Sequence, residues 1–167
     1  MKDRENLPFR KNCEGYFLCD DGKIIALDTG KGYLELPGGG VDEGENPETA
    51  LIREAYEEAG VILDGNLKEI EKLSFIWDNN WAKTEKQKKR YAKFKGEEMH
   101  FFLGKVKKLV SPPGDPITGE SGWNGERKMS IDNAIEIISN EKPFSKDMAP
   151  YREIQLKILN SLKENSI

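Results

Sequence analysis

The feature of this 167-residue sequence that most constrains its fold is a helix with two marked ends. Asn46 is a good N-cap, Pro47 suits the first helical position, and Gly60 suits the C-terminal cap. The run PGGG at residues 37–40 predicts a stop in regular structure, where backbone can approach a ligand closely. The sequence therefore predicts a loop followed by a helix over residues 46–60.

On a helical wheel this helix divides into an apolar face and a charged face. The apolar arc consists of Leu51, Ile52, Ala55, Tyr56 and Ala59. The opposite arc consists of Arg53, Glu54, Glu57 and Glu58, with the small Ala50 among them. Two interpretations compete for the charged arc. It is either a solvated surface balanced by the arginine and nearby lysines, or a site for a divalent cation such as Mg²⁺ or Mn²⁺, which prefers oxygen ligands.

Strand and helix signals alternate along the rest of the chain. Strands are expected at residues 14–19, 23–28, 33–36, 67–77 and 99–106. Further helices are expected at residues 131–139 and 148–163, with a long loop at 112–125. The dipeptide Asp21-Gly22 predicts a hairpin between the first two strands. This mixture favours a layered α/β domain with a mixed sheet, and the length suits a single domain over residues 1–167.

Composition excludes several other classes of protein. No apolar run approaches the roughly 20 residues of a membrane helix, and the N-terminal residues lack the core of a signal peptide, so a cytoplasmic protein is expected. The net charge of -4 argues against a general nucleic-acid binder. Cys13 and Cys19 are expected to be buried free thiols on one strand, too far apart for a mutual disulfide. The only histidine, His100, leaves too few ligands for a structural zinc site and is expected to be an ordinary strand residue.

The segment 39–61, GGVDEGENPETALIREAYEEAGV, has a distinctive spacing of glycines and charges. Its key positions are Gly39, Glu45, Arg53, Glu54, Glu57, Glu58, Gly60 and Val61. This pattern resembles the signature of the Nudix hydrolases, the MutT-like superfamily, with Ala55 smaller than the usual apolar residue. The resemblance implies an α/β/α sandwich, with the Nudix box at 39–61 and a basic insertion at about 79–97.

The resemblance also implies a reaction: metal-assisted attack of water on a phosphorus atom of a nucleoside diphosphate derivative. The implied metal ligands are Gly38 through its carbonyl, Glu54, Glu57, Glu58 and a later acidic residue, for which Glu98 is preferred over Glu97. Arg53 is expected to orient Glu57, and either Glu54 or Glu57 is expected to act as the base. The cofactor is expected to be Mg²⁺ or Mn²⁺. A Nudix-like domain that binds nucleotides without turnover is the alternative, although such domains usually lose metal glutamates that this chain retains.

The substrate is expected to be a nucleotide or another small molecule that contains a diphosphate. No proline follows the box before Ser111, which counts against an ADP-ribose hydrolase, and the expected tyrosine of dinucleoside polyphosphate hydrolases is missing. Of the substrate classes considered, nucleoside triphosphates remain as the expected one. No membrane and no stable nucleic-acid complex are expected as partners, and a homodimer is compatible with the resemblance.

The basic insertion offers a second set of candidates for substrate binding. Lys88, Lys89 and Arg90 are expected to grip the polyphosphate, and Trp77 and Trp81 to stack on a base. The alternative is a solvated hairpin loop that contacts no substrate.

Overall fold

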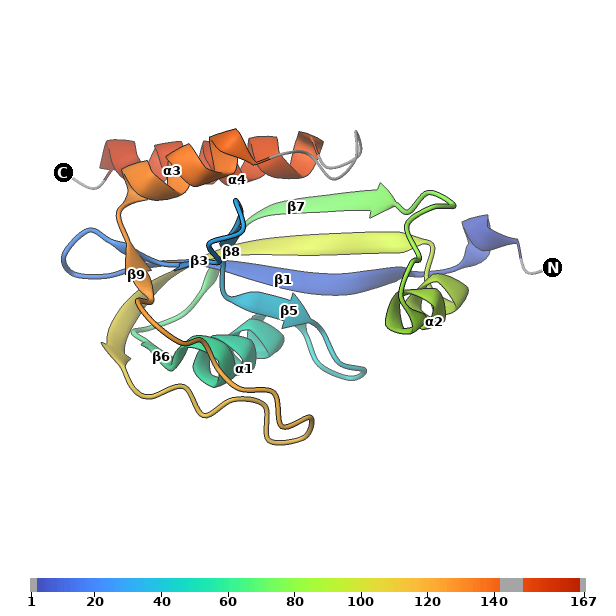
Figure 1. The fold of residues 1–167 in the computed structure, drawn as a ribbon, viewed down its shortest axis with the longest axis horizontal. Helices are drawn as coiled ribbons and strands as arrows, with labels where there is room; N and C mark the ends of the chain where they lie inside the picture. The colour runs from blue at the N-terminus through green and yellow to red at the C-terminus, as the bar shows by residue number, and fades with distance from the viewer. Residues whose placement is uncertain (1–2, 142–148, 166–167) are drawn as a thin grey trace.

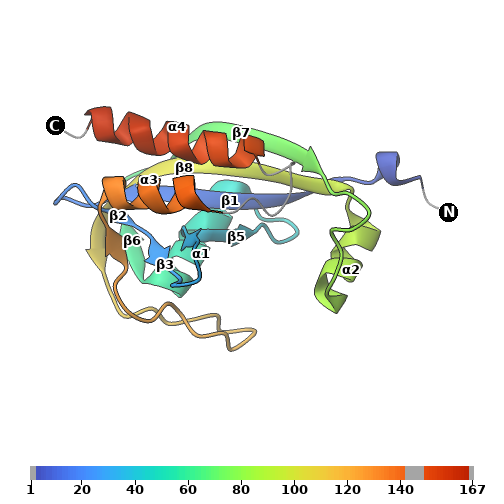
Figure 2. The ribbon, with the colours of Figure 1, turned by 45° about the horizontal axis from the view of Figure 1, so that its top comes forward.

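The structure, a computed structural model, describes residues 3–141 and 149–165. A curled mixed sheet separates helix α1 from helices α3 and α4, and helix α2 stands at one end of the sheet (Figures 1 and 2). The helical elements are η1 (Arg4–Asn6), α1 (Pro47–Ala59), α2 (Glu85–Lys93), α3 (Ile131–Asn140) and α4 (Ala149–Asn165). This arrangement confirms the predicted α/β/α sandwich.

The main sheet is built around two long strands, β1 (Phe9–Leu18) and β8 (Gly96–Leu109), which run parallel with Cys13 opposite His100. The other strands of this sheet are β2 (Ile24–Ile25), β5 (Gly38–Gly40), β6 (Val61–Leu63), β7 (Lys68–Ile76) and β9 (Lys128–Met129). The strand order is β6-β8-β1-β2-β9, with β5 also paired to β1 and β7 to β8. A separate pair is formed by β3 (Leu27–Asp28) and β4 (Leu34–Glu35).

Alternate residues of the central strands feed two hydrophobic cores. Phe17 and Phe102 pack toward α1, against the buried Leu51 and its alanine neighbours. Tyr16 and Phe101 point to the other face and pack beneath α3 and α4. The central pair of strands is thus buried on both faces, which fixes the position of α1 and of the sheet beside the site.

Several sequence expectations are confirmed by these elements. The side chain of Asn46 accepts a hydrogen bond from the Thr49 N–H at 2.8 Å, and Gly60 ends α1 with a left-handed φ of 62°. The hairpin turns at Gly22, where φ is 81°. The two cysteines are buried and free, although Cys19 lies one residue beyond the end of β1.

Other expectations are corrected. The glycines of PGGG do not interrupt regular structure but form strand β5, which pairs with residues 12–14 of β1. On α1, Ile52 and Tyr56 are about half exposed, at 48% and 45%, so the buried stripe is narrower than the wheel predicted. The basic insertion is a capped helix, α2, and not a loop, because Thr84 and Gln87 form a reciprocal capping box.

No helix in the described part of the chain is both long enough and apolar enough to cross a bilayer.

Candidate active site

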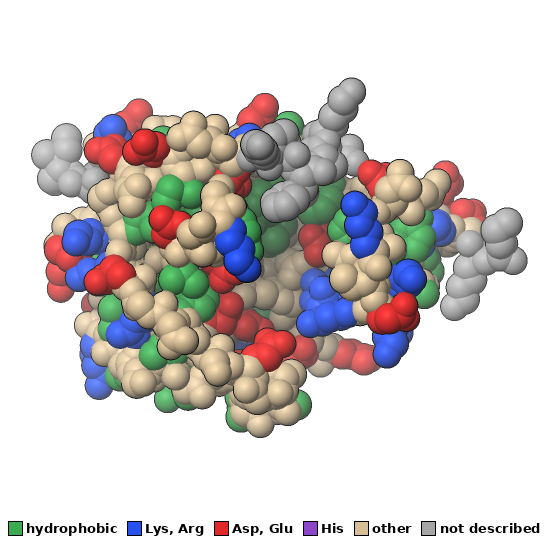
Figure 3. All heavy atoms as spheres, in the orientation of Figure 1, with side chains coloured by type: hydrophobic (Ala, Val, Ile, Leu, Met, Phe, Trp, Pro, Cys, Tyr) green, Lys and Arg blue, Asp and Glu red, His purple; other side chains and the backbone are tan. Residues whose placement is uncertain are grey.

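A cleft of about 480 Å³ opens between α1, β5, α2 and the loop that follows β8. Figure 3 shows this hollow with acidic side chains on its floor and basic side chains on the wall formed by α2. The residues of α1 and β5 that line it are Gly38, Gly39, Gly40, Glu54, Glu57 and Glu58. The charged arc of α1 therefore faces a cleft and is not merely a solvated surface.

Arg53 organises the carboxylates at the start of this arc. Its Nε and Nη2 atoms donate to the two oxygens of Glu45, both at 3.0 Å. Its Nη1 atom donates to Glu54 at 3.0 Å and to Glu57 at 3.4 Å. Hydrogen bonding to Arg53 lowers the pKa of Glu45, which in turn accepts from the Asp42 N–H and ties the loop before α1 to the helix. The arginine thus holds two cleft glutamates in place while Glu45 anchors the arginine.

Glu58 lies deepest among the α1 glutamates. Its Oε1 atom accepts a hydrogen bond from the Gly38 N–H at 3.1 Å. Burial, together with repulsion from Glu54, Glu35 and Glu57, raises the pKa of Glu58 from 4.5 to about 8. Burial also raises the pKa of Glu54, against the opposing effect of Arg53. The protein partners on the floor of the cleft therefore do not fully compensate ionised carboxylates there, which favours binding of a proton or another cation.

The glycines of β5 are required by close approaches. A Cβ atom on Gly40 would lie 2.2 Å from a guanidinium nitrogen of Arg10, which passes over this residue into the cleft. A Cβ atom on Gly39 would lie 3.0 Å from the carboxyl group of Glu54. The glycine run therefore leaves room for one charged side chain from β1 and another from α1.

Of the two neighbouring glutamates on β8, Glu97 and not Glu98 lies near the glutamates of α1. Glu97 accepts a hydrogen bond from Asn12 at 2.8 Å, forms an ion pair with Arg10, and shares a neighbouring cavity with Glu58. Glu98 points to the opposite face of the strand, where it contacts His100 at 2.7 Å and Lys72 at 3.5 Å. Side chains alternate along a strand, so the pairing of β8 with β1 places Glu97, and not the expected Glu98, on the face of β8 that shares a cavity with Glu58.

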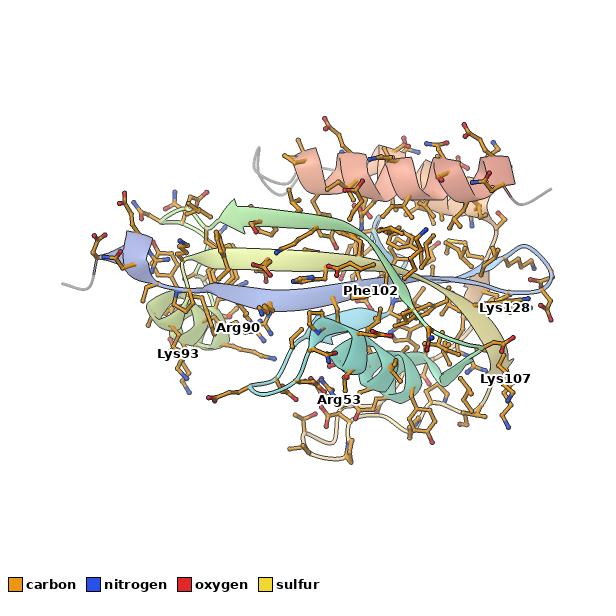
Figure 4. All side chains as sticks on the ribbon, turned by 180° about the vertical axis from the view of Figure 1, so that it is seen from behind. Arg53, Arg90, Lys93, Phe102, Lys107 and Lys128 are labelled. Atoms are coloured by element: carbon orange, nitrogen blue, oxygen red, sulfur yellow. The ribbon has the colours of Figure 1, made fainter. Side chains whose placement is uncertain are left out.

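The basic wall of the cleft consists of Arg10 from β1 and Lys86 and Arg90 from α2. Arg90 was among the predicted residues; Lys86 and Arg10 were missed. Lys88 does not line the cleft but pairs with Glu85 at 3.4 Å, and Lys89 is exposed outside it. Figure 4 shows Arg90 and Lys93 on α2 and Arg53 on α1.

The tryptophans expected to bind a base lie elsewhere. Trp77 is buried and stacks on Trp81, with ring centroids 3.7 Å apart and an interplanar angle of 3°. Neither ring lines the cleft. The two rings stack on each other at the junction between β7 and α2, outside the cleft in which a base was expected to bind.

The loop between β8 and β9 supplies the remaining wall, to which Trp123 contributes. The Gly114 and Trp123 N–H groups donate to the Glu57 and Glu58 carbonyls at 2.9 and 2.7 Å. These bonds use carbonyl groups at the end of α1, which lack partners within the helix. The loop thereby places Asp115 and Thr118 at the rim of the cleft.

A second cavity, of about 640 Å³, adjoins the cleft through Glu35 and Glu58. At its base Glu14 is buried and accepts hydrogen bonds from the Tyr16 hydroxyl at 2.7 Å and from the Tyr151 hydroxyl. Burial raises the pKa of Glu14 despite these bonds. The space available to a ligand therefore extends from the α1 glutamates toward α4.

The residues present fit a hard divalent cation. They offer carboxylate oxygens of Glu54, Glu57 and Glu58 on one wall of one cleft, where burial and mutual repulsion disfavour their ionised forms unless a cation is bound. Within residues 3–141 and 149–165, no three acidic, histidine or cysteine side chains already converge on one point. Cation binding would therefore draw these side chains together from their present contacts with Arg53 and β5.

Comparison with known proteins agrees with this geometry. The profile of the NUDIX domain matches residues 14–149. The chain belongs to the Nudix family. A Nudix fold is also found in similar solved structures: a MutT chain from a study of Aliivibrio salmonicida and Vibrio cholerae has a TM-score of 0.52 at 17% identity, covering 89% of this chain and 96% of that one. A NUDIX hydrolase from Nitrosomonas europaea has a TM-score of 0.54 at 14% identity, covering 95% and 90%.

Relatives in sequence carry two descriptions. An RNA pyrophosphohydrolase of Sphingopyxis alaskensis is 34% identical over 117 residues, which cover 62% of this Nudix chain and 66% of the relative. Nudix hydrolase 26, chloroplastic, of Arabidopsis thaliana is 32% identical over 127 residues, which cover 68% and 54%. An RNA pyrophosphohydrolase of Aeromonas hydrophila is 39% identical over 77 residues, covering 45% and 40%. The chain thus spans between 40% and 66% of the lengths of these relatives.

Proposed function

We propose that this chain is a Mg²⁺-dependent hydrolase that cleaves a diphosphate linkage in a nucleotide, with Mn²⁺ able to replace Mg²⁺. One observation carries the proposal: three glutamates of α1 face a cleft whose other wall presents Arg10, Lys86 and Arg90. The carboxylates suit hard cations, and the basic side chains suit the phosphate oxygens that such cations bridge.

The metal would be held by Glu54, Glu57 and Glu58, with the Gly38 carbonyl beside them and Glu97 in place of Glu98. When bound, the metal neutralises the diphosphate and polarises the attacked P–O bond. Arg53 holds the side chains of Glu54 and Glu57 in place through its two hydrogen bonds. One of these two glutamates takes the proton of the attacking water, and the raised pKa of Glu54 suits that task.

The substrate class follows from the relatives and from the size of the site. Two of the relatives described above are named RNA pyrophosphohydrolases, which supports a 5′-triphosphate group on a nucleoside or on the end of an RNA as the substrate. The two adjoining cavities offer room for a diphosphate beside the glutamates and for a further moiety toward α4. The alternative of an inactive nucleotide-binding module has no support among these relatives.

Release of phosphate and pyrophosphate tests the proposal directly. The purified protein should hydrolyse a nucleoside triphosphate or a 5′-triphosphorylated RNA only when Mg²⁺ or Mn²⁺ is added. Glu54→Gln keeps the shape of the side chain but removes a negative ligand, and should lower kcat/KM by about 100-fold or more. A protein that binds nucleotides tightly yet releases no phosphate from either class, from dinucleotides or from nucleotide sugars would be a binding module instead.

A further inference from the structure

One side of α2 carries a stripe of basic side chains, and only part of this stripe lines the cleft. At 100° per residue, the side chains of Lys89, Lys93, Lys86 and Arg90 fall in that order on one continuous arc. Lys86 and Arg90 form the inner half of the stripe and line the cleft. Lys89 and Lys93 form the outer half, are exposed, and lie outside the cleft lining. The stripe therefore begins at the proposed diphosphate site and continues away from it along the helix.

The stripe is free to meet a ligand. Among the described residues, Lys88 pairs with Glu85, whereas none of the four stripe residues forms an ion pair with a carboxylate. Glu97 interacts electrostatically with Arg90 from a distance. Four cations within about two turns nevertheless repel one another and gain from a chain of anions laid along them. Only the inner half lines the cleft, so a ligand that also contacts the outer half must carry phosphates that continue beyond the group bound in the cleft.

The opposite side of α2 is anchored, so the stripe has a fixed direction. Arg4 donates to the Tyr91 and Phe94 carbonyls and stacks over the Tyr91 ring at 3.3 Å. The Tyr91 hydroxyl donates to Asn79 at 2.9 Å, and the Lys95 N–H donates to the Pro8 carbonyl at 3.0 Å. A solvated loop would present its lysines in many directions; this helix presents them in one.

We propose that the outer half of the stripe binds the phosphodiester backbone of an RNA whose 5′-triphosphate occupies the cleft. This inference rests on the proposed hydrolase function and names the substrate as an RNA end. Contact is transient and electrostatic: the cleft recognises the 5′ group, and Lys89 and Lys93 hold the following phosphates without reading bases. An overall charge of -4 is compatible with this role because one group of positive side chains lies directly beside the cleft (Figure 3).

The test compares two substrates in one double variant. Lys89→Glu/Lys93→Glu should raise KM for a 5′-triphosphorylated RNA of about eight nucleotides by roughly tenfold or more at about 50 mM salt. For a nucleoside triphosphate the increase should be about twofold, from the weakened general field. The slope of log KM against log salt for the RNA should fall by about 1.4, or about 0.7 for each lost phosphate contact. The matched control is Lys107→Glu/Lys108→Glu, which makes the same change in charge on exposed residues at the far end of β8 (Figure 4).

The outcomes are distinct. Equal increases in KM for the two substrates, or no increase for the RNA, would overturn the proposed binding of the RNA backbone by Lys89 and Lys93. The proposed hydrolase function would be unaffected. If the parent protein hydrolyses neither substrate, the hydrolase proposal fails. Fluorescence anisotropy with the same RNA then still tests whether the outer half of the stripe binds the RNA backbone. In that case the parent must bind the triphosphorylated RNA more tightly than Lys89→Glu/Lys93→Glu does, and a 5′-hydroxyl RNA must bind more weakly than the triphosphorylated one. Circular dichroism of each variant verifies that α2 has not melted.

Discussion

The two helices that frame the cleft, α1 and α2, are stabilised in different ways. α1 buries Ala50, Leu51, Ala55 and Ala59 against the sheet, whereas no residue of α2 is buried. α1 is thus held by packing along its length, and α2 by its capping box and by Arg4 at its back. The contrast separates two tasks: the helix that bears the carboxylates is fixed by the core, while the helix that bears the cations stands at the edge, where a long substrate can reach it.

The largest effect on activity is expected from a substitution in the charged arc of α1. Glu57→Gln removes a carboxylate that we propose as a metal ligand, and one partner of Arg53. Because several kcal/mol of charge stabilisation are at stake, kcat/KM with Mg²⁺ should fall by about 100-fold or more. Steady-state kinetics measure this loss, and an unchanged melting temperature shows that the fold is intact. Turnover close to that of the parent would show that the glutamates are misassigned.

The second effect concerns pH and the buried carboxyl of α1. Since the folded-state pKa of Glu58 is raised from 4.5 to about 8, the metal-free folded protein keeps a proton that the unfolded chain loses. Its stability should therefore fall as pH rises from about 4.5 to about 8. Glu58→Gln removes this dependence and should gain on the order of 2 kcal/mol in free energy of unfolding, relative to the parent, across that window. Denaturant unfolding at several pH values measures the difference.

Two controls sharpen this result. Mg²⁺ should reverse the advantage of Glu58→Gln, because carboxylates bind the metal in their ionised form. Glu45→Gln should behave in the opposite way, since Arg53 lowers the pKa of Glu45 and the folded protein loses that stabilisation as pH falls. Parallel pH profiles for all three proteins would rule out a raised pKa at Glu58.

The third effect comes from the α2 side of the cleft. Lys86→Gln/Arg90→Gln should raise KM for the preferred substrate by about five- to tenfold with little change in kcat, because these contacts hold substrate and transition state alike. The increase should shrink as salt rises, since the Debye length is only about 10 Å at 0.1 M. Lys107→Gln/Lys108→Gln serves as the control for charge. A fall in kcat without a change in KM would assign the basic wall to the chemical step.

The smallest effect tests how each helix is held. Thr84→Ala removes the capping box of α2 and should cost that helix about 1 kcal/mol, so its first amides should exchange hydrogen about fivefold faster. The melting temperature should barely move, because α2 contributes nothing to the core. Asn46→Ala removes the equivalent cap of α1 and should lower the melting temperature, since α1 is packed against the sheet. Equal responses in the two variants would contradict the distinction between the helices.

Much of α1 and its chemistry was readable without coordinates, because the signals are local. The caps at Asn46 and Gly60 depend on neighbouring backbone, and the placement of Glu54, Glu57 and Glu58 on one wall of the cleft follows from helical periodicity. Local signals were also sufficient for the hairpin at Gly22 and for α3 behind Ser130. A local signal was also present for α2 but was not recognised: Thr84 and Gln87 form a capping box inside a segment dominated by lysines.

Only the tertiary structure decided the rest of the site. The choice between Glu97 and Glu98 depends on how β8 pairs with β1, and a shift of one residue would exchange them. The role of Arg10 and of the loop from Gly114 to Trp123 arises from contacts between segments far apart in the sequence. The direction of the basic stripe depends on Arg4, some 90 residues from its partner Phe94. The sequence by itself determined which groups one helix presents; what stands opposite them was set by long-range packing, because no local rule relates residues that only the fold brings together.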